Sequence, residues 1–318
     1  MKPDLTRRES LGAIGACIGL TPMLRPMTQA ADSQTMALAC GTYGLQAKPV
    51  ADAVAFIAAT GFDAAEISVM PGTTGDPATF SGDQRRAVKD KLGESGIRLC
   101  ALMADLHPSA DAAAHQEITD RFRGLCELAR ELSPDRPPLI QTVLGGKDWE
   151  ASKTLFRDRL ADWMQTAADQ KIVLAVKPHR GNAMSRPADA IWLIEQLGGS
   201  PWLRMVYDYS HFHLREPAMP IAGTVAESLP VTAYVAAKDA VERDGKVVFA
   251  LPGEGRGYDH ADILRAFHAG GFRGAVCVEI SAQIWKTAGY DGEAATRTSY
   301  RNLAAAFERA GIPRPKRG

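Results

Sequence analysis

The chain has 318 residues, of which 46% are hydrophobic and 23% charged, and its formal net charge is zero. This composition excludes an intrinsically disordered chain, because enough apolar side chains are present to bury a core. The balanced charge, with no basic stripe of interleaved aromatic residues, argues against a nucleic acid partner. We therefore expect a folded protein whose partner is not a nucleic acid.

Residues 1–35 have the layout of an export signal. Arg7 and Arg8 precede a short, mildly apolar stretch rich in Gly and Ala, as in a twin-arginine signal. The stretch is too short to span a bilayer, which takes about 20 apolar residues. Two ends are open: cleavage before Ala31, or lipid attachment at Cys17 in a lipobox-like "IGAC". We expect delivery to the periplasm or the outer face of the membrane; a disordered basic N-terminus is the alternative.

From residue 36 to 318, short apolar runs alternate with longer amphipathic ones. Nearly continuous apolar runs of this kind are typical of parallel strands that are covered on both faces. Eight runs qualify, at 36–45, 64–69, 98–104, 138–144, 171–177, 203–208, 231–238 and 275–280. Eight strands alternating with helices, with no internal linker, predict an α/β fold consisting of one (β/α)8 barrel over residues 36–318.

Helix signals lie between these strands. Val50, Val54 and Ile57 are spaced for one helical face, and Gly61 follows as a stop. Three further boundaries are a cap at Ser185 before Pro187, a cap at Asp259, and a last helix over 292–311.

Two smaller patterns refine the barrel. "GFDAAEI" (61–67) and "GGFRGAVCVEI" (270–280) both contain a helix stop, a Phe, a strand and then Glu-Ile, which is a faint internal repeat. Asp244-Gly245 predicts a hairpin turn in the loop after the seventh strand. The cysteines beyond residue 17 form no CxxC or Cys/His cluster and are expected to be structural: Cys40, Cys100, Cys126 and Cys277.

Barrel enzymes place their chemistry at the C-terminal ends of the strands. Lys177, Asp208 and Glu279 each close a strongly apolar run, where a charge needs a partner. Glu66 also ends a strand. Further polar candidates at strand ends or in nearby loops are His107, Gln141, His179, Arg180, His211 and Lys238, together with Glu254 and Arg256 of "GEGRG", which are expected to close over the pocket.

Four segments resemble the sugar phosphate isomerase/epimerase family of xylose isomerase-like TIM barrels over about residues 36–310: "LAVKPHRG", "VYDYSH", "VAAKD" and "VEI". The resemblance implies a divalent metal held by Glu, Asp, His and Glu, at positions that fall here on Lys177, Asp208, Ala236 and Glu279. Asp208, with His211 three residues on, and Glu279 match this pattern; Lys177 and Ala236 do not. We therefore expect no resident metal, with Mn, Zn or Mg as the alternative.

The resemblance also implies chemistry: a proton next to a carbonyl is removed, and the metal stabilises the enediolate that forms. Here Lys177 is expected to supply that positive charge, one against the two negative charges of Asp208 and Glu279. His211 and His179 are the expected proton carriers. The expected substrate contacts are Arg180, His107, Gln141, Lys238, Glu254 and Arg256.

The favoured function is therefore an exported isomerase or epimerase of a sugar, keto-sugar or polyol. A lyase or dehydratase acting on a 3-keto sugar or glycoside is one alternative, since it uses the same enolate. A non-catalytic sugar-binding barrel is the other. The sequence indicates neither the identity of the carbohydrate nor the oligomeric state.

Replacing both Arg7 and Arg8 with lysine should retain the precursor in the cytoplasm, because the twin-arginine route reads that pair. Cell fractionation followed by immunoblotting measures the distribution. Unchanged delivery to the envelope would contradict the export assignment.

Overall fold

The computed structural model describes residues 34–316, so the predicted export segment with Arg7, Arg8 and Cys17 lies outside it. Eight parallel strands close into a barrel in the order β1-β10-β7-β6-β5-β4-β3-β2. Their bounds are β1 (Ala37–Gly41), β2 (Ala64–Ser68), β3 (Arg98–Met103), β4 (Leu139–Thr142), β5 (Leu174–Val176), β6 (Leu203–Tyr207), β7 (Thr232–Ala237) and β10 (Ala275–Val278). The predicted barrel is confirmed.

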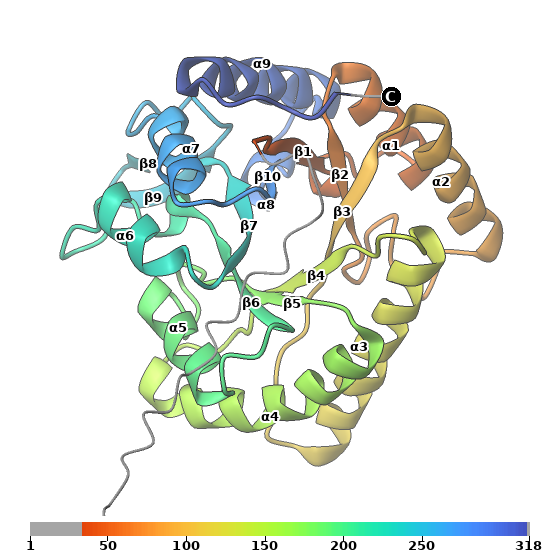
Figure 1. Cartoon of the computed structure of the whole chain (residues 1–318), viewed down its shortest axis with the longest axis vertical. Helices are drawn as coiled ribbons and strands as arrows, with labels where there is room; N and C mark the ends of the chain where they lie inside the picture. The colour runs from red at the N-terminus through yellow and green to blue at the C-terminus, as the bar shows by residue number, and fades with distance from the viewer. Residues whose placement is uncertain (1–33, 317–318) are drawn as a thin grey trace, which may run out of the picture. The chain divides into compact units, whose positions relative to one another are not determined.

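Helices surround the ring of strands (Figure 1). They are α1 (Val50–Thr60), α2 (Gly82–Ser95), α3 (Ala112–Leu132), α4 (Trp149–Gln170), α5 (Pro187–Gln196), α6 (Ile221–Ser228), α7 (His260–Ala269), α8 (Ala282–Trp285) and α9 (Gly292–Ala310), with the short 3-10 turns η1 (Thr42–Gly44) and η2 (Tyr209–His211). Within residues 34–316, no helix combines the length and apolar character needed to cross a membrane.

Most predicted boundaries agree with the structure. Gly61 ends α1 with φ of 116°, a conformation that favours glycine, and the Asp259 side chain caps α7 by accepting from the Ala261 N–H. The predicted strand at 171–177 becomes regular only at Leu174, because Lys171 ends α4 in the left-handed region with φ of 53°.

The predicted cap at Ser185 is wrong. The N-cap of α5 is Arg186, and the carboxylate of Asp189 accepts the backbone N–H groups of both Ser185 and Arg186. The carboxylate at the third position of the helix therefore accepts the N–H groups of the N-cap residue and of the residue before it, as the N3 side chain does in a capping box.

The predicted hairpin is confirmed as an antiparallel pair, β8 (Asp239–Arg243) and β9 (Lys246–Ala250). Asp244 and Gly245 form its turn with φ of 50° and 70°, as a two-residue hairpin loop with positive φ at both positions requires.

Side chains alternate between two apolar layers. Large residues such as Leu38, Ile67 and Val278 face the helices, whereas the inside of the barrel holds mainly small side chains. The inner set is Ala37, Ala39, Ala64, Cys100, Ala101, Ala175, Val206, Tyr234, Ala236, Ala275 and Cys277. Cys40, Cys100, Cys126 and Cys277 are all buried and free, as expected of structural cysteines. The small inner side chains leave room for polar groups at the C-terminal ends of the strands.

Candidate active site

Four charged side chains meet inside the C-terminal end of the barrel. They come directly after or at the ends of β5, β6, β7 and β10, which are neighbours in the ring. Two residues earlier on each strand, Ala175, Val206, Ala236 and Cys277 face the barrel interior. Because side chains on a strand alternate, the four charged residues also point inward. They are Lys177, Asp208, Lys238 and Glu279, each at most 7% exposed; we refer to them as the ion cluster.

The ion cluster is a closed set of contacts. Lys177 Nζ donates to Glu279 Oε2 and lies 3.9 Å from Asp208 Oδ2. Lys238 Nζ donates to Glu279 Oε1 at 2.8 Å and also to Asp208 Oδ2. Two ammonium groups thus face two carboxylates. The prediction that Lys177 is the single positive charge against these two carboxylates is wrong, because Lys238 also contacts both of them.

Mutual pairing sets the protonation of the cluster. Burial alone disfavours the Lys177 ammonium, but the carboxylates of Glu279 and Asp208 outweigh it and raise the pKa of Lys177 to about 12. Burial also opposes ionisation of Glu279, yet Lys177 and Lys238 lower its pKa to about 2. The pKa of Asp208 is likewise held well below its usual range, against burial, by Lys238 and His211. The carboxylates are therefore ionised and Lys177 is a fixed cation.

His211 is fully engaged in this network and has no exposed surface. Its Nδ1 accepts the Arg180 backbone N–H at 3.2 Å, so the neutral ring carries its proton on Nε2, which faces Asp208 Oδ2 at 3.4 Å. Burial and then Lys238, 3.2 Å from Nε2, lower the pKa of His211 to about 3 despite the nearby carboxylate. His211 therefore stays neutral with both nitrogens occupied.

His179 packs against His211 with ring centroids 4.1 Å apart. Burial, followed by the charges of Lys177 and Lys238, lowers the pKa of His179 to about 4. Its Nδ1 is buried and has no hydrogen bond partner within residues 34–316. His179 is thus a neutral imidazole with an unused nitrogen beside the ion cluster.

Glu66 lies in the middle of β2, not at its end as predicted, and only 1% of it is exposed. Its Oε2 accepts from Tyr234 OH at 2.9 Å and from Gln141 Nε2. Gln141, predicted as a substrate contact, therefore holds Glu66, while its Oε1 is buried and without a partner in the described part of the chain.

The other predicted contacts lie further out. His107 pairs with Asp105 at 2.8 Å and is half-exposed, and the Arg180 guanidinium donates to the carbonyls of His213 and Leu214. Glu254 and Arg256 are exposed and, within residues 34–316, form no hydrogen bond or ion pair with the ion cluster. These four stay predictions as substrate contacts.

The hairpin contributes an aromatic cover that the sequence did not reveal. Phe249 on β9 lies 4.9 Å from Lys238 Nζ by its ring centroid and 5.0 Å from the His211 ring. A ring face next to an ammonium is a favourable electrostatic contact that also excludes water.

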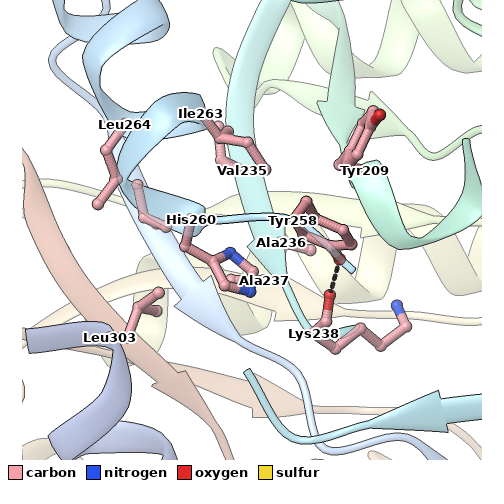
Figure 2. A pocket seen from close by; sticks show the side chains of 11 residues that line it. Tyr209, Val235, Ala236, Ala237, Lys238, Tyr258, His260, Ile263, Leu264 and Leu303 are labelled. Carbon is pink, nitrogen blue, oxygen red and sulfur yellow. Dashed lines mark hydrogen bonds between the residues drawn. The ribbon is translucent and has the colours of Figure 1, made fainter. Parts of the chain in front are cut away.

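Behind β7, a small cavity against α7 carries polar groups that anchor the loop beyond the hairpin. Figure 2 shows Tyr258 bonded to the carbonyl of Lys238, whose side chain extends away from His260. Asp239 pairs with His260 Nε2 at 2.7 Å and accepts the Gly255 N–H at 2.7 Å. The segment that carries Lys238 is therefore held from behind.

The residues present do not fit the divalent ion that the resemblance implies. Ala236 has no ligand atom, Lys177 is an ammonium, and both oxygens of Glu279 accept from lysines. Asp208 Oδ2 accepts from Lys238. Across residues 34–316, no three His, Cys, Asp or Glu side chains gather as a metal site. Two fixed cations would also repel a third.

The geometry defines a (β/α)8 barrel with a charged site at the C-terminal ends of its strands. The chain matches the family described as xylose isomerase-like TIM barrel over residues 54–306, and it belongs to that family. No curated protein sequence matches it.

Solved structures share the fold at low identity. L-ribulose 3-epimerase superposes with a TM-score of 0.69 and 18% identity, covering 87% of this chain and 96% of that one. The 3-keto-D-glucoside 4-epimerase from E. coli gives 0.66 and 16%, covering 86% and 99%. The probable 3-DHS dehydratase from Bacillus anthracis gives 0.68 and 13%, covering 85% and 99%. At these identities the likeness shows the fold alone.

Replacing Lys177 with Met should cost about 3–5 kcal/mol of unfolding free energy at pH 7, since it leaves buried carboxylate charge undercompensated. The folded pKa of Glu279 lies below its ordinary value of 4.5, at about 2. The stability that its ionised form contributes is therefore present above pH 4.5 and lost as the pH falls toward 2. The deficit of the variant should shrink accordingly at pH 3.5.

Urea unfolding at pH 7 and pH 3.5 measures the two values. Lys89→Met, which removes an exposed lysine from α2, is the control and should be nearly neutral at both. An equal deficit for Lys177→Met at both pH values would contradict the charge-compensation account.

Proposed function

We propose that this chain is an isomerase or epimerase that moves a proton at the carbon next to the carbonyl of a sugar, keto-sugar or related polyol, without a resident divalent metal. The single observation that carries the proposal is the fixed Lys177 ammonium, accompanied by Lys238, at the strand ends where the family resemblance implies metal ligands. Export to the periplasm or to the outer face of the membrane remains part of the proposal, as predicted from residues 1–35.

Positive charge is what this reaction needs. Removing the proton places negative charge on the carbonyl oxygen, and a preorganised cation stabilises that charge without rearranging solvent. An ammonium about 4 Å from the oxygen contributes about 4 kcal/mol at an effective dielectric constant of about 20. That corresponds to roughly a thousandfold in rate. Asp208 and Glu279 support this role by keeping Lys177 charged.

The proton carrier must be a group with a free lone pair. Asp208 and Glu279 are poor candidates, because lysines occupy their oxygens and lower their pKa values. His211 uses both ring nitrogens. His179 has an unused nitrogen, so of the two predicted histidine carriers it is the better placed, and His211 acts as a positioning residue in this proposal.

Incubation with a panel of ketoses, aldoses and 3-keto-glycosides in deuterated water tests the proposed function. We expect deuterium at the carbon next to the carbonyl without net loss of sugar, and no inhibition by EDTA. An enone product would instead indicate a lyase, which remains the second candidate because elimination passes through the same enolate. Saturable binding without exchange would indicate a sugar-binding protein, and abolition by EDTA would overturn the metal-free site.

Two histidine variants separate the predicted carriers. His179→Asn should lower kcat about 100-fold while KM changes little, the usual range for general acid–base catalysis. His211→Asn should instead lower the thermal midpoint, since it disturbs the buried contacts with Asp208 and Arg180. Steady-state kinetics and thermal unfolding measure both; a large loss of kcat in a fully stable His211→Asn protein would restore His211 as the carrier.

A further inference from the structure

The Glu-Ile repeat seen in the sequence places two glutamates on either side of one strand. β2 and β10 both pair with β1. Gly41 of β1 is the register partner of Glu66 on β2. On the other side, Cys40 pairs with Val278, so Gly41 is also level with the next residue, Glu279. Glu66 and Glu279 therefore occupy equivalent positions at the same level of the barrel interior. The ion cluster accounts for Glu279 and leaves Glu66 without a role.

The backbone is shaped around the Glu66 carboxylate. A Cβ atom at position 41 would lie 2.8 Å from Glu66 Oε1, so Gly41 is the residue that leaves space for this oxygen. The other oxygen is held by Tyr234 and Gln141, from β7 and β4. Three strands thus fix one buried carboxyl group in place, which is the preorganisation that a proton-transfer group requires.

The two glutamates have opposite electrostatic surroundings. Glu279 touches two ammonium groups and stays ionised. Glu66 touches neutral donors; burial raises its pKa and Lys177 only partly offsets this, which leaves the pKa of Glu66 at about 7. Paired carboxyl groups whose environments push their pKa values apart are a recurring arrangement for separating an electrostatic role from an acid–base role.

Within residues 34–316, the titratable or charged groups that interact electrostatically with Glu66 are Cys40 on β1, Cys100 on β3, Lys177 after β5, Tyr234 on β7, and Cys277 and Glu279 at β10. Burial raises the pKa of the three thiols and of Tyr234, so these stay neutral near pH 7. Lys177 and Glu279 stay charged there. Within this set, only Glu66 changes its charge close to neutral pH.

We propose that Glu66 is a catalytic acid–base residue of this site, which takes up and returns the substrate proton from a different part of the barrel wall than the one that carries His179. β2 and β5 are separated by β3 and β4 in the closed ring, so the two groups approach a substrate over Lys177 from different strands. This inference rests on the proposed function.

The step balances without a co-reactant. The Glu66 carboxylate takes the proton from the carbon next to the carbonyl, the C–H electron pair becomes the carbon–carbon double bond, and the carbonyl oxygen becomes an oxyanion beside the Lys177 ammonium. The Glu66 carboxylic acid then returns the proton to the former carbonyl carbon. His179 takes the hydroxyl proton from the carbon that was deprotonated and gives it to the oxyanion, so that the carbonyl re-forms at the deprotonated carbon. Because the base form is needed first, kcat/KM should rise with pH through about 7.

Glu66→Gln keeps the shape of the side chain and its contact with Tyr234, and it removes the titration. We expect at least about a 100-fold loss of deuterium exchange into the substrate. The rise of kcat/KM with pH near pH 7 should disappear, and the thermal midpoint should stay close to that of the wild type. Glu195→Gln, which changes an exposed glutamate on α5, is the matched control and should keep both rate and profile.

Tyr234→Phe is the second variant and decides the matter if Glu66→Gln does not fold. Removing a donor to the carboxylate raises the pKa of Glu66, so the rise of kcat/KM should move to higher pH. Carbon-13 NMR of glutamate carboxyl groups provides a readout without substrate: one resonance should titrate near pH 7, vanish in Glu66→Gln and persist in Glu195→Gln.

The outcomes separate the two proposals. Exchange by the wild type that persists unchanged in Glu66→Gln, or a rise of kcat/KM with pH that Tyr234→Phe does not move, overturns the role of Glu66 and leaves the proposed function standing. No exchange by the wild type with any panel sugar overturns both, and the NMR titration then still reports whether Glu66 ionises near neutral pH.

Discussion

Compensation of buried charge is the constraint on which this site depends. Transferring a carboxylate or an ammonium from water into a protein interior costs several kcal/mol per ion, and the attraction between partners repays this only when their geometry is good. Lys177 and Lys238 meet Asp208 and Glu279 with every carboxylate engaged by an ammonium. The two histidines next to these lysines stay neutral because burial, followed by the charges of the lysines, lowers their pKa values.

The small side chains inside the barrel make this arrangement possible. Residues such as Ala175, Ala236 and Cys277 are small and form the layer below the charged residues, and Gly41 leaves the space that Glu66 fills. A core of larger residues at these positions would displace the polar groups toward solvent, where their pKa values would return toward ordinary ones. The layer of small residues below the site therefore helps to keep its charged groups buried.

Within a family whose resemblance implies a divalent metal, this chain retains the barrel and two of the four ligand positions but carries an ammonium at a third. A lysine differs from a metal in having no open coordination position and in depending on its neighbours to stay charged. The two carboxylates, ligands in the implied metal site, act here as counterions. At these strand ends the positive charge is that of lysines, and the residues at two of the implied ligand positions, Lys177 and Ala236, supply no ligand atom.

The sequence by itself determined the barrel, the hairpin and three members of the ion cluster. Continuous apolar runs report burial on both faces of a strand, and a charge that closes such a run at Lys177, Asp208 or Glu279 must find a partner. These inferences need only local pattern.

The tertiary structure alone decided how those charges are shared. Lys177 and Glu279 are 102 residues apart, and Glu66 and Tyr234 are 168 apart, so their contacts arise only when the ring closes. Lys238, predicted to be a substrate contact, lies between both carboxylates. His211 has both ring nitrogens occupied. Burial and pKa depend on neighbours from several strands at once, and no spacing within one segment carries that information.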